Sequence, residues 1–198
     1  ARGGRGGRPG GRAGRPGAGA PRPALGIGGA ATGGLAGLVA GDPALDAALD
    51  SGGALLLSNP HNPLGKVFPR DELLAVATAC LARGALIISD EIHAELLFDG
   101  RRHIPTASLS PEIARRTITL MSASKAYNIA GLKTSFAIIQ NAKVRERVNS
   151  ARAGMVDSVN ALGLEAPRAA YSEAGPWLEA LKAYLQANRD YLVDAVKT

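Results

Sequence analysis

Four short runs of almost wholly apolar residues recur along the chain and constrain what it can fold into. They are ALLLS at 54–58, ALIIS at 85–89, TITLM at 117–121 and TSFAIIQ at 134–140. Short apolar runs without alternation are typical of strands that are buried on both faces, as in parallel sheets. Helical patterns separate or follow these runs, so the sequence predicts an α/β fold with a mostly parallel sheet and flanking helices in three layers.

The helical segments are marked by their end signals. Residues 69–84 are amphipathic, with a proline at the start and Gly84 as the stop. A short helix is predicted around 42–51, another follows the fourth strand at 141–154, and residues 175–198 form a long helix at the end. Cys80 lies in the first of these helices and is the only cysteine, so no disulfide can form within the chain.

Residues 1–41 differ in composition from the rest of the chain. They hold 16 of the 25 glycines and six arginines, with no acidic or aromatic residue. The remainder carries 17 basic and 17 acidic side chains, so the net charge of +6 arises from this segment. A segment of this kind buries too little surface to offset its ordering entropy, which predicts disorder.

The arginine–glycine repeats in residues 1–11 resemble segments that bind RNA, but they lack the aromatic residues that stack on bases. Nucleic-acid binding is therefore the lesser alternative, and a terminal extension without a binding role is favoured. No apolar run approaches the length of a membrane-spanning helix. Together with the single cysteine, this favours a cytoplasmic location without membrane association.

Polar residues follow three of the four predicted strands. NPHNPLG comes after the first strand, DEIH after the second and SASK after the third, so that Asn62, Asp90 and Lys125 follow successive strands. Ligands of open α/β sheets bind at the carboxyl ends of the strands. Each motif alone also has a structural explanation, as a turn, a helix cap or a solvated lysine.

Taken together, the three motifs indicate a site for one small molecule. A desolvated lysine amine has a lowered pKa and condenses with a carbonyl group to form a Schiff base. A carboxylate can hold a protonated heterocyclic nitrogen, and an amide can donate to a ring oxygen. These are the requirements of pyridoxal 5′-phosphate, which predicts that compound as the cofactor.

NPHNPLG, DEIH and SASKAYNIAGL, in this order, resemble the class I/II aminotransferase superfamily, which has the fold-type I architecture of pyridoxal-phosphate enzymes. The spacings agree, with 28 residues from Asn62 to Asp90 and 35 from Asp90 to Lys125. The wording of NPHNP, DEIHAEL and NIAGL is most similar to the PatB-type branch of cystathionine β-lyase-like C–S lyases.

The resemblance implies a role for each matching position. Lys125 would bind the cofactor's aldehyde and then remove the substrate's α-proton. Asp90 would pair with the pyridine nitrogen. Asn62 would hydrogen-bond the phenolic oxygen, where many relatives also place a Tyr or His from the position that His93 occupies here, and Ser122 would contact the phosphate.

Other residues are less specific. Lys133 stands where many relatives have a phosphate-binding arginine, and a lysine there would bind as a point charge without two-pronged geometry. Ser124 would either support the turn or touch phosphate. His61 and His103 are expected to be structural or exposed. The histidines and the cysteine lack metal-ligand spacing, so no metal site is predicted.

The resemblance also implies a division of the chain. Residues 42–174 would be part of the cofactor-binding large domain, and residues 175–198 a helix leading to a small domain that is absent. Complete relatives are about twice as long. The expectation is therefore a chain with an uncovered apolar face and impaired activity, from a family of homodimers.

The implied activity is a C–S β-lyase that acts on a small sulfur-containing, β-substituted amino acid and releases a thiol, pyruvate and ammonia. An aminotransferase of the same superfamily is the first alternative. A non-enzymatic chain whose basic tail binds RNA is the second.

Overall fold

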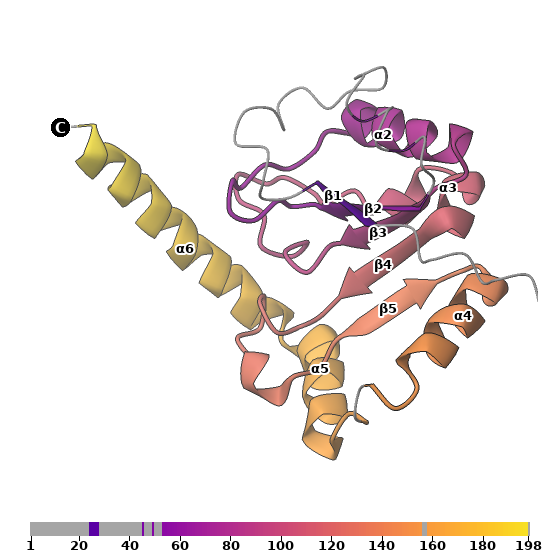
Figure 1. Ribbon diagram of the computed structural model, residues 1–198. Coiled ribbons are helices and arrows are strands. Elements are labelled where there is room, and N and C mark those ends of the chain that lie inside the picture. Colours follow the sequence, from indigo (N-terminus) through magenta and orange to yellow (C-terminus); the bar gives the residue numbers. More distant parts are fainter. Residues whose placement is uncertain (1–23, 28–44, 46–48, 50–52, 156–157, 198) are drawn as a thin grey trace, which may run out of the picture.

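A five-stranded sheet forms the centre of the computed structural model, which describes residues 24–27, 45, 49, 53–155 and 158–197 (Figure 1). The spatial order is β1-β2-β3-β4-β5. Their bounds are β1 Ala24–Ile27, β2 Ala54–Ser58, β3 Leu86–Asp90, β4 Thr117–Met121 and β5 Phe136–Ile139. The first four strands pair in parallel and β5 pairs antiparallel with β4. The predicted α/β fold with a mostly parallel sheet is thus confirmed.

The strand register brings three carboxyl ends to the same level. Ser58 lies opposite Asp90, and Asp90 lies opposite Leu120. Because β5 is antiparallel, its first residue, Phe136, lies opposite Met121, the last residue of β4. The polar motifs that follow β2, β3 and β4, and the turn that precedes β5, therefore meet at one edge of the sheet.

Helices lie on both faces of the sheet. The 3-10 helices are η1 Thr106–Ser108 and η2 Ala130–Leu132, and the α-helices are α2 Arg70–Ala82, α3 Pro111–Arg116, α4 Ala142–Arg152, α5 Ala161–Glu173 and α6 Gly175–Val196. The predicted helices at 69–84, 141–154 and 175–198 are confirmed with slightly shorter bounds. The sequence pattern missed α3 and α5, the latter of which contains Pro167.

The hydrophobic core lies between the sheet and the helices α2 and α3. Leu55, Leu57 and Ile87 point to this side, where Leu73 of α2 and Ile113 of α3 are also buried. The opposite face is packed by α4 only near β5 (Figure 1).

Some apolar side chains of the sheet remain uncovered. Leu56 is 41% exposed on the face of the sheet where α4 packs. Phe136 and Ile138 of β5 are 42% and 50% exposed on the face where α2 and α3 pack. The expectation of uncovered apolar surface is confirmed for these residues.

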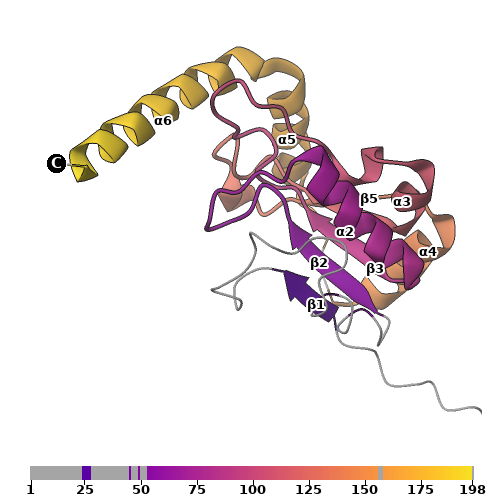
Figure 2. The ribbon, with the colours of Figure 1, turned by 90° about the horizontal axis from the view of Figure 1, so that it is seen from above.

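The long helix α6 extends away from the sheet, and β1 lies at the opposite edge (Figures 1 and 2). In its C-terminal half, α6 is joined to the segment after β3, because Arg189 forms two hydrogen bonds of 2.8 and 2.9 Å with the Asp99 carboxylate.

The expectation of disorder in residues 1–41 is wrong for Ala24–Ile27. These four residues form β1, which pairs in parallel with β2 (Figure 2). Main-chain pairing with β2 stabilises this short strand at the edge of the sheet. The remainder of the segment, with its arginine–glycine repeats, lies outside the described residues.

The helix predicted around 42–51 is described only at Leu45 and Leu49, both of which are helical and buried. Among the described residues, no helix has the length and apolar character needed to cross a membrane.

Candidate functional site

Asp90 is the last residue of β3 and is half-buried at the edge where the strand ends meet. Its carboxylate Oδ1 accepts a hydrogen bond of 3.2 Å from the amide of Ile92. Its carbonyl oxygen accepts one of 3.0 Å from the amide of Asn59. Asp90 also lines a cavity of about 630 Å³ between the sheet and α4. Main-chain pairing on both sides therefore fixes the carboxylate at this edge.

Asn62 lies in a tight turn after β2. The His61 amide donates to the Lys66 carbonyl and the Gly65 amide donates to the His61 carbonyl, both at 2.8 Å. The peptide bonds Asn59–Pro60 and Asn62–Pro63 are cis. The turn holds Asn62 exposed at the wall of a second cavity, of about 530 Å³, which His93 also lines.

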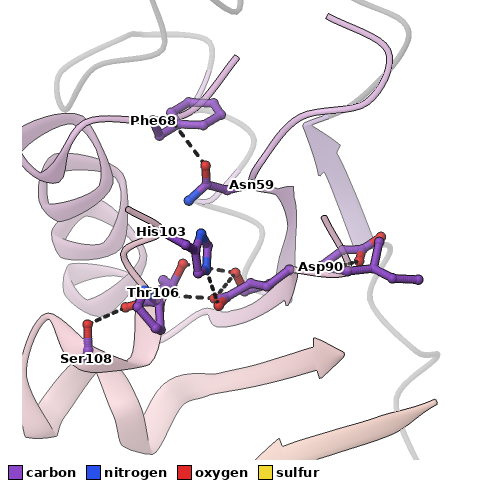
Figure 3. Close-up of polar contacts among 10 residues, drawn as sticks. Asn59, Phe68, Asp90, His103, Thr106 and Ser108 are labelled. Carbon is purple, nitrogen blue, oxygen red and sulfur yellow. Dashed lines mark hydrogen bonds and ion pairs between the residues drawn. The ribbon is translucent and has the colours of Figure 1, made fainter. Parts of the chain in front are cut away.

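Two buried side chains stand behind this turn. Asn59 is fully buried, and its Oδ1 accepts a 3.0 Å hydrogen bond from the amide of Phe68 (Figure 3). His61 is 3% exposed and lines the second cavity, and neither of its ring nitrogens has a hydrogen-bond partner. The expectation that His61 is structural or exposed agrees with its burial, whereas the role of Asn59 was not predicted.

The charges of Asp90 and Lys125 both act on the imidazole of His93. Burial lowers the pKa of His93 below its ordinary value; the negative charge of Asp90 opposes this shift and the positive charge of Lys125 adds to it. The imidazole of His93 is therefore mostly neutral at neutral pH.

Lys125 is exposed, which corrects the expectation of a desolvated amine. It follows β4 in a turn, while its neighbours Ala123 and Ala126 are buried. Lys125 lines neither of the two cavities described above. Its amine is accessible to a small molecule because the described chain leaves this edge of the sheet open.

Tyr127 anchors the segment that carries Lys125. Its ring meets that of Tyr171 of α5 edge-to-face at 5.5 Å and stacks on Trp177 of α6 at 6.4 Å. Such aromatic pairs contribute beyond the area that they bury. The two C-terminal helices are thus joined directly to the lysine segment.

Ser122, Ser124 and Thr134 form a cluster of oxygen atoms. The Ser122 Oγ lies 2.6 Å from both the Ser124 Oγ and the Thr134 carbonyl oxygen, and it accepts a 3.0 Å hydrogen bond from the Ser124 amide. Ser122 is 2% exposed. Lys133 precedes Thr134, is exposed and has left-handed backbone angles, with φ of 51°. The structure thus brings Ser122 and Lys133 to one turn, with Ser122 engaged inside it.

A buried carboxylate behind Asp90 was missed by sequence reasoning. Glu91 is 1% exposed, and its Oε1 accepts hydrogen bonds from the Ser89 hydroxyl at 2.8 Å and the Thr106 amide at 3.0 Å. Its Oε2 lies 2.7 Å from Nε2 of His103, and Figure 3 shows His103 and Thr106 converging on this position. His103 is therefore structural, as expected. The alternation of side chains along a strand was the available signal. Glu91 is two residues after Ser89 and four after Ile87, so its side chain points to the same covered face as theirs.

Glu95 is a second acid that was not singled out. Burial raises the pKa of its carboxyl group. Burial also raises the pKa of Tyr171 to about 12, and the negative charge of Glu95 adds to this rise. Oε2 of Glu95 is buried without a hydrogen-bond partner.

We expect Glu95→Gln to stabilise the chain at pH 7 and to leave its stability unchanged at pH 4. Because the folded-state pKa lies above the ordinary 4.5, the folded chain keeps a proton that the unfolded chain releases. The free energy of unfolding therefore falls as pH rises from 4.5 through the folded-state pKa, and glutamine removes this fall. Urea unfolding at the two pH values measures the effect. The matched control is Glu146→Gln on the exposed surface of α4, and equal midpoints for both variants at pH 7 would contradict the prediction.

Comparisons with known proteins identify the family of the chain. The family "Aminotransferase class I and II" matches residues 42–198. Cystathionine beta-lyase PatB of Bacillus subtilis (strain 168) is 40% identical over 134 residues, covering 67% of this chain and 35% of PatB. The chain thus spans about a third of the length of this curated relative.

Solved structures show the same fold. The crystal structure of OvoB matches with a TM-score of 0.73 and 49% identity, covering 75% of this chain and 39% of OvoB. Cystalysin from Treponema denticola, whose structure contains a pyridoxal 5′-phosphate cofactor, matches with a TM-score of 0.72 and 34% identity. It is covered over 39% of its length, and this chain over 76%. These similarities confirm the predicted fold-type I architecture, and the chain belongs to the aminotransferase class I and II family.

Proposed function

We propose that the protein is a pyridoxal-phosphate-dependent C–S β-lyase that acts on a small sulfur-containing amino acid such as cystathionine and releases a thiol, pyruvate and ammonia. The observation that carries the proposal is that Asp90, His93 and Lys125 lie at or after the carboxyl ends of the neighbouring strands β3 and β4, in a chain 40% identical to a cystathionine β-lyase over 134 residues.

The residues at this edge fit the cofactor chemically. Lys125 offers an exposed amine for an aldehyde, and Asp90 offers a half-buried carboxylate for a protonated ring nitrogen. Asn62 is exposed beside a cavity of about 530 Å³ and offers an amide donor for a phenolic oxygen. When bound, pyridoxal 5′-phosphate supplies a conjugated ring that accepts the electron pair left by loss of a substrate proton.

Each side chain of the site would have a separate role. The Nζ of Lys125 would hold the cofactor through its aldehyde and, once released, accept the α-proton of the substrate. That ammonium could afterwards protonate a thiolate that leaves from the β-carbon. Asp90 would keep a proton on the ring nitrogen by charge pairing, and the neutral His93 would lie beside Asn62 at the phenolic oxygen.

Ser122, Ser124 and Lys133 would hold the phosphate end. The Ser122 hydroxyl is engaged with Thr134, so its contribution includes holding the turn that carries Lys133. Ser124 is the more accessible of the two hydroxyls. Lys133 would add a positive charge without the two-pronged geometry of an arginine.

A homodimer in the cytoplasm is part of the proposal. The exposed apolar side chains Leu56, Phe136, Ile138 and Trp177, each at least 41% exposed, support association with further protein. The single buried cysteine suits a reducing compartment.

The test is release of pyruvate from cystathionine by the purified chain with pyridoxal 5′-phosphate and no keto acid. We expect pyruvate formation with an equal amount of thiol, because the chain has the residues named above. Amino-group transfer to an added keto acid without pyruvate would favour the aminotransferase alternative. No product under either condition would contradict lyase activity for this chain.

A further inference from the structure

The N-terminal turn of α5 packs directly on the turn that carries Lys133. Asn160 begins this helix, and its Oδ1 accepts a 2.8 Å hydrogen bond from the amide of Gly163. Gly163 is buried. A Cβ atom at this position would lie 2.4 Å from Oγ1 of Thr134, 2.9 Å from Cγ1 of Val159 and 3.2 Å from the carbonyl oxygen of Leu132. The helix and the turn therefore approach more closely than any residue with a side chain would permit.

Thr134 links this close approach to the oxygen cluster. Its carbonyl oxygen lies 2.6 Å from the Ser122 hydroxyl, and its Oγ1 donates a 3.2 Å hydrogen bond to the Leu132 carbonyl. Lys133 lies between these residues with left-handed backbone angles. A displacement of Thr134 would therefore move both the partner of Ser122 and the main chain that orients Lys133.

We propose that Gly163 is a positioning residue for the phosphate end of the cofactor site. The absence of a side chain lets α5 press the Leu132–Thr134 turn against Ser122, which sets the places of Ser122, Ser124 and Lys133. The part of this inference that concerns phosphate rests on the proposed function, whereas the hold on the turn stands on the contacts alone.

The test compares Gly163→Ala with Gly131→Ala in the full chain. Gly131 lies in the adjacent η2, where an added Cβ would meet no atom within 4 Å. We expect hydrogen exchange of the Ser124 amide to become about tenfold faster in Gly163→Ala, because its bond to Ser122 is disturbed, and to stay unchanged in Gly131→Ala. Affinity for pyridoxal 5′-phosphate should fall about tenfold in Gly163→Ala, while affinity for pyridoxal, which lacks phosphate, should not change.

Thr134→Ala provides a rescue. It removes the nearest atom that an alanine at 163 would meet, leaves the Val159 side chain and the Leu132 carbonyl in place, and keeps the carbonyl group that Ser122 contacts. The double variant is expected to regain slow exchange at Ser124 and most of the phosphate-dependent affinity, even where Gly163→Ala alone folds poorly.

The outcomes separate the two proposals. Equal Ser124 exchange in Gly163→Ala and Gly131→Ala would overturn the inference, whatever the cofactor does. An equal loss of affinity for pyridoxal and its phosphate would overturn the assignment to the phosphate end. Failure of the unsubstituted chain to bind pyridoxal 5′-phosphate would overturn the proposed function and the phosphate assignment, and the exchange comparison would still decide whether Gly163 holds the turn.

Discussion

Replacement of Lys125 by alanine is expected to abolish the visible absorption band that the purified chain develops with pyridoxal 5′-phosphate. Lys125 presents an exposed amine beside His93 and Asp90, and only a covalent bond to the aldehyde would keep the band through dialysis. The measurement is the absorption spectrum of both chains after addition of the cofactor and exhaustive dialysis. The expected loss is complete, because Lys133, the other lysine of the proposed site, is assigned to the phosphate end and not to the aldehyde.

The control is Lys143→Ala, which removes an exposed lysine of α4 that has no proposed role. This variant should keep the full band, because Lys143 is not among the residues proposed to hold the cofactor. A band that persists in Lys125→Ala would assign the reaction to another lysine. A chain without any band would contradict cofactor binding by the described residues.

The sheet was the most predictable part of the fold. The runs at 54–58 and 117–121 match β2 and β4, and 85–89 matches β3 to within one residue. Buried strands can be recognised in a sequence as uninterrupted runs of apolar residues. The fourth strand is shorter than its pattern, at Phe136–Ile139, because Lys133 and Thr134 are engaged in the turn that precedes it.

Two helices could not be predicted from periodicity. The six residues of α3 are too few to display a helical period, although Ser110 caps the helix by accepting from the amide of Ile113. The proline within α5 reads as a helix breaker in isolation. The Asn160 cap and the packing on the Leu132–Thr134 turn support this helix, and neither contact is visible in local sequence.

The site was predictable where chemistry follows a strand end. Asp90, His93 and Lys125 lie at one edge of the sheet because parallel strands bring their carboxyl ends together, which the motif order already implied. The exposure of Lys125 depends on which parts of the chain cover the edge, and no local pattern encodes that. The partners of Glu91 likewise come from η1 and the segment before it, far along the chain.

Glu91→Ala is expected to lower the free energy of unfolding by about 1–3 kcal/mol for each buried group that is left without its hydrogen-bond partner. The substitution leaves His103, the Ser89 hydroxyl and the Thr106 amide without their shared acceptor in a site that is almost closed to water. Urea unfolding followed by circular dichroism measures the change.

Two controls separate the buried pair from a general effect of losing an acid. Glu91→Gln keeps an oxygen that can accept from Ser89 and Thr106, so it should lose less stability than the alanine variant. Glu146→Ala, on the exposed surface of α4, should unfold at the urea concentration of the unsubstituted chain.

An unchanged midpoint for Glu91→Ala would mean that the network does not hold the segment after β3. Since that segment carries His93, and Asp90 directly precedes Glu91, the same substitution should also weaken cofactor binding. The buried pair would then stabilise the fold and keep the candidate site in place through the same contacts.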